Sequence, residues 1–271
     1  IHSRALRCAA MNRVAHTFEH DMFVRTLAAR ADAPALVYLH GLGESGLCFE
    51  RLARHPALAT CRHVIPDLPG YGRSPWPAQP LDLLAVADWL AVWLGAREHG
   101  PVILVGHSMG GVLGVILAER HPEVVRALVN IEGNVSLGDC VFSGQAAAVT
   151  VDAMVDGGLD ALAERIYVDG ATRPALRGYY ASMRFADPRT FHRHALDLVA
   201  ASRDESMAAR LAALRVPLTY VAGVPDGIAP RSHELLAQHR VAVDAIGPAG
   251  HWPFIDQEGA TAAVIARAVK G

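Results

Sequence analysis

The chain has 271 residues, of which 52% are hydrophobic and 19% are charged, enough to bury the core of one large α/β domain. Its formal net charge of −2 gives no basic field for gathering phosphates, and no run of like charges indicates a nucleic-acid-binding arm or a membrane-binding patch. We therefore expect neither nucleic acid nor a membrane as partner, and the composition favours small-molecule chemistry.

The cysteines and the start of the chain indicate the compartment. The chain has four cysteines, Cys8, Cys48, Cys61 and Cys140. They form neither a CxxC pair nor the paired spacing of a zinc site or a disulfide framework, so a reducing cytoplasm is the expected location. Residues 1–20 lack the continuous apolar core of a signal peptide, and Met11 is a candidate for the natural start.

In the first half of the chain, short apolar runs alternate with an amphipathic stretch. Strands are predicted over 35–41 and 63–70, and a helix over 81–96. These segments begin a strand-and-helix alternation that continues through the rest of the sequence.

The run VILVGHSMGGVLGVILAER, residues 102–120, is nearly long enough and apolar enough to cross a membrane. His107 and Ser108, packed between glycines, interrupt its centre. A buried strand, a sharp turn at Ser108 and a helix that ends before Pro122 account for the sequence better.

The second half of the chain resumes the alternation after one long interruption. Further strands are predicted over 125–133, 216–223 and 241–246, and helices over 231–239 and 255–269. Residues 135–214 show helical periodicity and loops but no convincing strand. We therefore predict an α/β fold with a mostly parallel sheet and helices on both faces. The core comprises 1–134 and 215–271, and 135–214 form a helical cap over the active edge.

The turn within the interrupted run carries a catalytic motif. Residues 106–110, Gly-His-Ser-Met-Gly, match G-x-S-x-G between a predicted strand and a predicted helix, which is the context that this motif requires. Such a tight turn strains the serine backbone, and side chains two positions away on either side would collide, so glycine occupies both places. Ser108 is therefore the predicted nucleophile.

A serine hydroxyl needs a base to take its proton and a third group to orient that base. His251 lies in the glycine-bounded loop GPAGHWPFIDQ, between the last predicted strand and the closing helix. For the carboxylate we prefer Asp226 in VAGVPDGIAP, and Glu132 in VNIEGN, also at a strand end, stays open as the alternative.

Acyl chemistry also needs donors for a developing oxyanion. The segment LHGLGESG, residues 39–46, follows the first confident strand, and its glycines allow the backbone to approach a substrate closely. The backbone amides of Leu42 and Met109 are the predicted oxyanion donors.

With these segments in order, the chain resembles the α/β-hydrolase superfamily over nearly its whole length. The matching segments are HGLG at 40–43, DLPGYGRS at 67–74, GHSMGG at 106–111, GVPDGIAP at 223–230 and GHWPFIDQ at 250–257. The resemblance implies an α/β-hydrolase fold with Ser108 as nucleophile, His251 as base, Asp226 as acid and a lid over 135–214. It implies no metal or cofactor. Relatives that cleave epoxides or carbon–halogen bonds carry an aspartate at the elbow, so Ser108 argues against both activities.

The predicted activity is hydrolysis of a carboxylic ester of a hydrophobic or aromatic small molecule through an acyl-enzyme. Five aromatic residues of the cap predict an apolar pocket, unless they merely pack the cap onto the sheet: Phe142, Tyr167, Tyr179, Tyr180 and Phe185. A thioesterase, a lactonase or an acyltransferase with the same triad stays open, as does a ligand receptor with little turnover. The expected assembly is a monomer or a homodimer.

Overall fold

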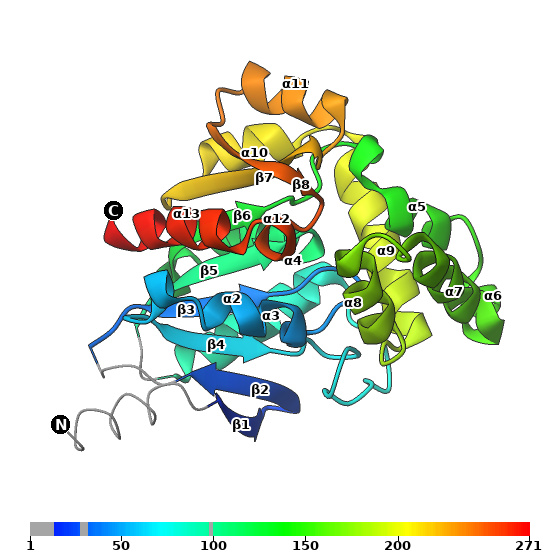
Figure 1. Ribbon diagram of the computed structural model, residues 1–271. Helices are drawn as coiled ribbons and strands as arrows, with labels where there is room; N and C mark the ends of the chain where they lie inside the picture. The colour runs from blue at the N-terminus through cyan, green and yellow to red at the C-terminus, as the bar shows by residue number, and fades with distance from the viewer. Residues whose placement is uncertain (1–13, 28–31, 98–99) are drawn as a thin grey trace.

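The structure is a computed structural model that describes residues 14–27, 32–97 and 100–271 (Figure 1). The expectations about Cys8, Met11 and the rest of residues 1–13 lie outside the described residues.

Eight strands form one sheet in the order β1-β2-β4-β3-β5-β6-β7-β8. Their bounds are β1 Val14–Glu19, β2 Met22–Leu27, β3 Ala35–Leu39, β4 Arg62–Pro66, β5 Val102–His107, β6 Val125–Ile131, β7 Leu218–Asp226 and β8 Val243–Gly250. From β4 to β8 across the sheet, every neighbouring pair is parallel. The predicted mostly parallel sheet is confirmed, and the carboxyl ends of β3–β8 meet at one edge.

The sequence patterns did not reveal the first two strands. β1 and β2 form an antiparallel hairpin, and β2 pairs antiparallel with β4 at the edge of the sheet. Four of the six β1 side chains are exposed. An edge strand of this kind has no buried apolar run, and so it gives little signal in a single sequence.

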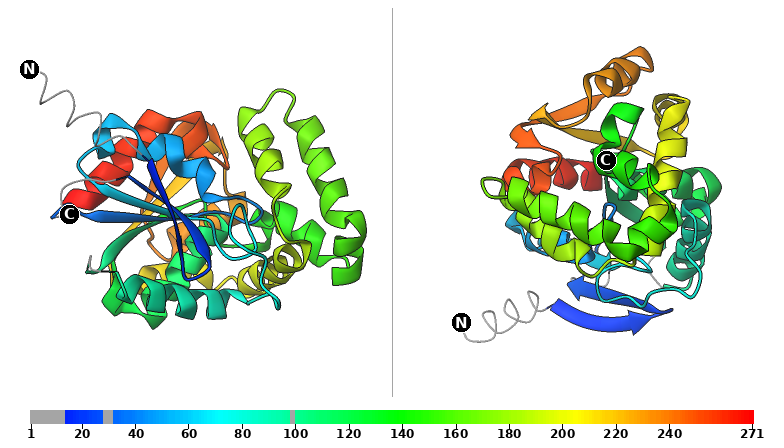
Figure 2. Two further views of the ribbon diagram at one scale, coloured as in Figure 1. Left: turned by 90° about the horizontal axis from the view of Figure 1, so that it is seen from below. Right: turned by 90° about the vertical axis from the view of Figure 1, so that its right-hand side faces the viewer.

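Helices cover both faces of the sheet, as predicted. In the left view of Figure 2, α13 (Glu258–Lys270) and α2 (Glu50–Ala53) lie on one face, and α3 (Leu83–Gly95) and α4 (Met109–Arg120) on the other. The run at 102–120 is β5, the turn at Ser108 and α4, whose residues 109–118 are all buried. Within the described residues, no helix is both long and apolar enough to cross a membrane.

The connection from β6 to β7 consists of helices and loops without a strand, and all its residues are described. It contains α5 (Val141–Ala147), α6 (Val151–Ala153), α7 (Leu159–Asp169), α8 (Pro174–Met183), α9 (Pro188–Arg203) and α10 (Met207–Ala213). Figure 1 shows α5–α9 beyond the carboxyl edge of the sheet; we call them the cap helices. In contrast, α10 packs beside α11 (Pro230–Gln238).

The cap helices are fastened to the core at two glycines. Gly43 has a φ of +73°, and a Cβ there would lie 2.7 Å from the Phe191 ring of α9. Gly70 has a φ of +83°, and a Cβ there would lie 2.8 Å from Thr190. The carbonyl oxygen of Gly70 also accepts a hydrogen bond from the Asp187 amide at 2.8 Å. At both positions, the absence of a side chain lets the cap approach the core loops closely.

Candidate active site

The turn between β5 and α4 has the strained geometry that the motif predicts. Ser108 has φ 52° and ψ −117°, a region that non-glycine residues rarely adopt. A Cβ on Gly106 would lie 2.3 Å from the carbonyl oxygen of Gly110, and a Cβ on Gly110 would lie 1.9 Å from that of Leu39. Both glycines are therefore required by close main-chain approaches, and the turn presents the Ser108 side chain at the sheet edge.

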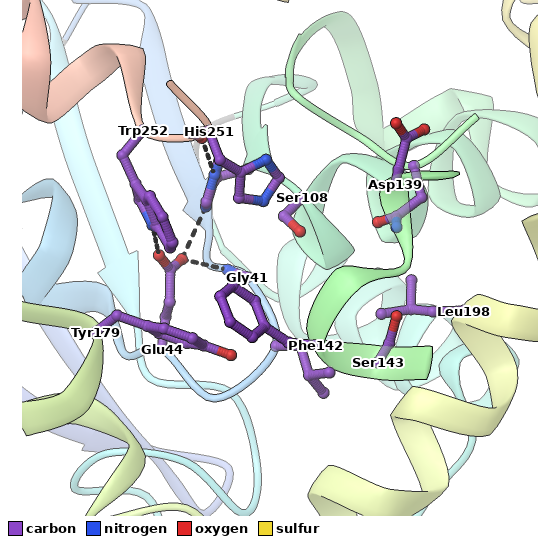
Figure 3. A pocket seen from close by; sticks show the side chains of 13 residues that line it. Gly41, Glu44, Ser108, Asp139, Phe142, Ser143, Tyr179, Leu198, His251 and Trp252 are labelled. Atoms are coloured by element: carbon purple, nitrogen blue, oxygen red, sulfur yellow. Dashed lines mark hydrogen bonds and ion pairs between the residues drawn. The ribbon is translucent and has the colours of Figure 1, made fainter. Parts of the chain in front are cut away.

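His251 comes from the loop between β8 and α12 (Pro253–Asp256). Its side chain is 25% exposed and lines the same pocket as Ser108. Figure 3 shows the imidazole beside the Ser108 side chain, so the structure brings together the predicted nucleophile and the predicted base.

The carboxylate that contacts this imidazole is Glu132, and the preference for Asp226 is corrected accordingly. Glu132 follows β6, is fully buried, and places Oε2 3.1 Å from Nδ1 of His251. Asp226 ends β7 beside Gly250 of β8, and its side chain is exposed. Two carboxylates lie near the same sheet edge, but only Glu132 points inward to the imidazole.

The last residues of β7 and the glycine that follows the strand accommodate Glu132. The amide of Gly223 donates a 2.5 Å hydrogen bond to Oε1 of Glu132. A Cβ on Gly227 would lie 2.4 Å from the same oxygen. Glu132 itself has a φ of +56°, which is unusual for a residue with a side chain. The segment that suggested Asp226 as the acid thus supplies a donor and space to the other carboxylate.

The environment of His251 sets its proton affinity. Burial alone would lower the pKa of the imidazole, because it disfavours the charged form. The hydrogen bond and the negative charge of Glu132, together with the charges of Glu44 and Asp139, outweigh burial, and the pKa of His251 is raised above 6.5. Glu132 therefore stabilises the imidazolium that forms when His251 accepts a proton.

A second carboxylate–imidazole pair lies next to the first. Glu44 and His107 are both almost fully buried, with Oε2 of Glu44 2.9 Å from Nδ1 of His107. Nε2 of His107 lies 2.8 Å from the main-chain carbonyl oxygen of His251, and the two imidazole rings are 4.8 Å apart. Both partners of His107 are acceptors here, so the two hydrogen bonds form together only when both ring nitrogens carry protons.

Glu44 also hydrogen-bonds to two other parts of the site, namely the loop that carries Leu42 and the residue that follows His251. It accepts hydrogen bonds from the amide of Gly41 at 2.6 Å and from Nε1 of Trp252 at 2.6 Å (Figure 3). Burial alone would raise the pKa of Glu44. The charge and hydrogen bond of His107, with the hydrogen bonds from Trp252 and Gly41, lower this pKa to about 2. One buried carboxylate thus joins the β3 loop, the elbow and the His251 loop.

The two predicted oxyanion donors lie beside Ser108. Leu42 lines the pocket in the loop after β3. Met109 is the first residue of α4, where a helix leaves its backbone N–H groups without an acceptor of its own. The positions suit an anion above Ser108, and the role of both amides stays a prediction.

About 350 Å³ of empty space, which includes open solvent, lies between the residues that line the pocket. Two of the five predicted aromatics, Phe142 and Tyr179, line it together with Leu198 and Trp252. The other three do not: Tyr167 and Tyr180 pack against each other, and Phe185 is exposed. The pocket also contains polar side chains that the expectation of an apolar pocket missed, namely Asn134, Asp139 and Ser143.

Two findings concern candidate metal ligands and cysteines in the described part of the chain. Among these residues, no group of three or more His, Cys, Asp or Glu side chains is arranged to hold a metal ion. Cys48, Cys61 and Cys140 are free thiols.

The comparisons with known proteins identify the family of the chain. A family model of the alpha/beta hydrolase fold matches residues 34–258, and the chain belongs to this family. Lipase LipV of Mycobacterium tuberculosis is 38% identical over 135 residues, which are 50% of this chain and 48% of LipV. A pimeloyl-[acyl-carrier protein] methyl ester esterase of Chromobacterium violaceum is 42% identical over 109 residues, 40% of this chain and 39% of the esterase. The chain thus matches about half or less of the length of these curated relatives.

Solved structures support the same fold. The enol-lactonase from Burkholderia xenovorans superimposes with a TM-score of 0.76 at 17% identity, covering 95% of this chain and 100% of the lactonase. This likeness shows the fold alone, because the identity is low.

Sequence reasoning missed several residues of the site. The sequence patterns gave neither Glu44 nor His107 a role in the site. Their pairing spans 63 positions of the chain. The available signal was a glutamate within an otherwise apolar, glycine-rich loop, where a carboxylate needs a buried partner. Trp252 and Asn134 gave no comparable signal.

Proposed function

We propose that this protein is a serine hydrolase that cleaves a carboxylic ester of a small molecule through an acyl-enzyme intermediate. Ser108 is the nucleophile, His251 the general base and Glu132 the orienting carboxylate. The observation that carries the proposal is that Ser108 and His251 line one pocket, while Glu132, from the end of a third strand, contacts the His251 imidazole. The ester-hydrolysing names of the two curated relatives support the reaction class.

In the first half of the reaction, His251 takes the proton of the Ser108 hydroxyl as its oxygen attacks the ester carbonyl. The carbonyl oxygen becomes an oxyanion, which the amides of Leu42 and Met109 stabilise; one such donor contributes about 3 kcal/mol in studied hydrolases. The tetrahedral intermediate then collapses, the bond to the alcohol breaks, and the alcohol leaves with the proton from His251.

In the second half, His251 takes a proton from water, and the hydroxide attacks the acyl-enzyme. The ester bond to Ser108 breaks, and His251 returns the proton to the serine oxygen. The carboxylic acid is released and the starting enzyme is restored. Throughout, Glu132 keeps Nδ1 of His251 protonated, so that Nε2 is the nitrogen that exchanges protons.

The pocket supports a small substrate with a hydrophobic or aromatic part. Phe142, Tyr179 and Trp252 provide ring faces, and Leu198 an aliphatic contact. About 350 Å³ of empty space favours short acyl chains over the long chains of storage lipids.

The test is active-site labelling with a fluorophosphonate, followed by peptide mass mapping. We expect a single adduct on Ser108 in the wild type and none in Ser108→Ala. Turnover of methyl and p-nitrophenyl esters should fall by about 10⁶-fold or to the assay limit in that variant. Labelling that survives Ser108→Ala, or binding of esters without turnover, would contradict the proposal.

The substrate panel includes thioesters, lactones and acceptor alcohols of matched acyl length. Faster hydrolysis of a thioester or a lactone, or faster acyl transfer to an alcohol, would replace ester hydrolysis as the proposed activity of the same triad. Ser136→Ala is a control, since this buried serine bonds Ser232 and does not line the pocket.

A further inference from the structure

Asn134 is a buried polar side chain in the active-site pocket with an unused acceptor. It lies between β6 and α5, its residue is 3% exposed, and it lines the pocket with Ser108 and His251. Its Oδ1 has no hydrogen-bond partner, and in the described part of the chain the only other buried side-chain atom in this state is Nε of Arg97.

The surroundings of the amide determine which end is free. Nδ2 of Asn134 lies 3.7 Å from Sγ of Cys140. The same sulfur lies 3.4 Å from Oγ of Ser202 and 4.0 Å from the carbonyl oxygen of Leu198, and a carbonyl oxygen can only accept. The single thiol proton is therefore directed toward Ser202 and Leu198, and the sulfur accepts from the Asn134 amide. Oδ1 remains as the free acceptor.

Asp139, a carboxylate that also lines this pocket, already accepts hydrogen bonds from the protein itself. Asp139 accepts from the amides of Val135, Ser136 and Ala229 and from the hydroxyl of Ser232. It holds the start of the cap in place and has little capacity left for a ligand. Of Asn134 and Asp139, Asn134 is therefore the residue with a free hydrogen-bond acceptor for a ligand.

Buried acceptors without a partner are rare in folded proteins, because burial removes the hydrogen bonds that water supplied. Where one lines a ligand pocket, a donor on the ligand restores the missing bond. We propose that Asn134 is a specificity-determining residue whose Oδ1 accepts a hydrogen bond from an N–H or O–H group of the substrate.

The proposal rests on the function proposed above and narrows its substrate class. The preferred esters carry an amide N–H or a hydroxyl within a few atoms of the scissile carbonyl. Purely hydrocarbon esters of the same shape leave Oδ1 unpaired and are turned over less efficiently.

The test compares matched methyl esters that differ in one donor. N-acetylglycine against N-acetylsarcosine removes an N–H, and 3-hydroxybutyrate against 3-methylbutyrate replaces a hydroxyl by a methyl of similar size. Each pair is also tested one methylene longer, so that the donor samples two distances from the carbonyl. Each kcat/KM is divided by the rate constant of hydroxide-catalysed hydrolysis, which removes the intrinsic reactivity of the ester.

For the wild type we expect a preference of about tenfold or more for the donor-bearing member of at least one pair. Asn134→Leu removes the acceptor at similar volume and should bring that preference within about twofold, through a lower kcat/KM of the donor-bearing ester. Gln145→Leu makes the same kind of change on an exposed cap residue outside the pocket and should keep the wild-type preference.

A wild type that hydrolyses both members of every pair equally would overturn the proposal, as would a preference that persists in Asn134→Leu. The wild-type comparison needs no variant, so it decides even if Asn134→Leu does not fold. If the wild type shows neither turnover nor a fluorophosphonate adduct, the proposed function fails and this inference with it. Turnover without a preference for the donor-bearing esters contradicts the role proposed for Asn134 and leaves the proposed function intact.

Discussion

Two carboxylate–imidazole pairs lie side by side in this site and differ in exposure and in hydrogen bonding. His251 of the first pair is one quarter exposed and faces the pocket, whereas both members of the second pair, Glu44 and His107, are at most 2% exposed. Nδ1 of His251 contacts Glu132, while both nitrogens of His107 contact acceptors. The first pair can exchange protons with a substrate, and the second pair can hold the first in place.

The difference shows why chemical type alone does not identify a catalytic dyad. Each pair contains a buried carboxylate within hydrogen-bond distance of an imidazole. What separates them is whether one ring nitrogen remains available next to the nucleophile. The comparison makes four predictions about these pairs.

The largest expected effect is from Glu132→Gln. Loss of the negative charge removes the stabilisation of the His251 imidazolium and the control of its tautomer, so kcat should fall by about 1,000-fold or more. Asp226→Asn is the matched control. Because Asp226 is exposed and the carboxylate in contact with the imidazole is Glu132, the kcat of this variant should stay within about twofold of the wild type. Steady-state kinetics on one ester measures both, and the reverse ranking would restore Asp226 as the acid.

Glu44→Gln should act mainly on stability and more weakly on catalysis. The amide cannot accept from Gly41, His107 and Trp252 as the carboxylate does, and a buried donor left without its acceptor costs about 1–3 kcal/mol of unfolding free energy. We expect kcat to fall by about tenfold, because the loops that carry Leu42 and His251 lose a shared anchor. Urea denaturation gives the stability and a kinetic assay gives kcat.

The pH dependence of Glu44→Gln gives a further check. The pKa of Glu44 is lowered from 4.5 to about 2 in the folded protein, so its carboxylate stabilises the fold fully above pH 4.5. That contribution is lost as the pH falls toward 2. The difference in unfolding free energy between wild type and variant should therefore be constant near neutral pH and shrink below pH 4.5. A difference that does not change with pH would argue that the charge of Glu44 is unimportant.

The smallest expected effect is a shift in the pH profile. His251 must be neutral to act as base, and its raised pKa keeps it protonated to higher pH than an ordinary histidine. The wild-type kcat/KM should therefore rise with pH through a midpoint above 6.5. Glu132→Gln should move this midpoint to lower pH, and Glu44→Gln should move it less, because the contribution of Glu44 is the smaller one. Equal shifts in the two variants would erase the distinction between the pairs.

Much of the fold and half of the site could be predicted from the sequence. Apolar runs and their spacing predicted the parallel strands, and the glycines around Ser108 predicted the strained turn, because both depend on local sterics. The position of His251 followed from the loop after the last strand. These features are local, and a single sequence records them directly.

The acid could not be chosen in this way. Glu132 and Asp226 each follow a strand, and their strands are neighbours in the sheet. Which carboxylate reaches His251 depends on the left-handed backbone of Glu132 and on the space beside Gly227, neither of which has a sequence pattern of its own. The pairing of Glu44 with His107 likewise depends on how two distant loops meet.

The close approach of α9 to Gly43 ties the mechanics of the cap to the chemistry below it. Gly43 directly follows Leu42, whose amide is a candidate for receiving the negative charge of the intermediate, and it touches Phe191, Met183 and Tyr179 on the cap. Movement of these helices away from the core, to admit an ester or to release an acid, would therefore remove the packing that supports the loop of Leu42 and Gly43. In the proposed hydrolase, substrate exchange and stabilisation of the oxyanion would then take place at different times.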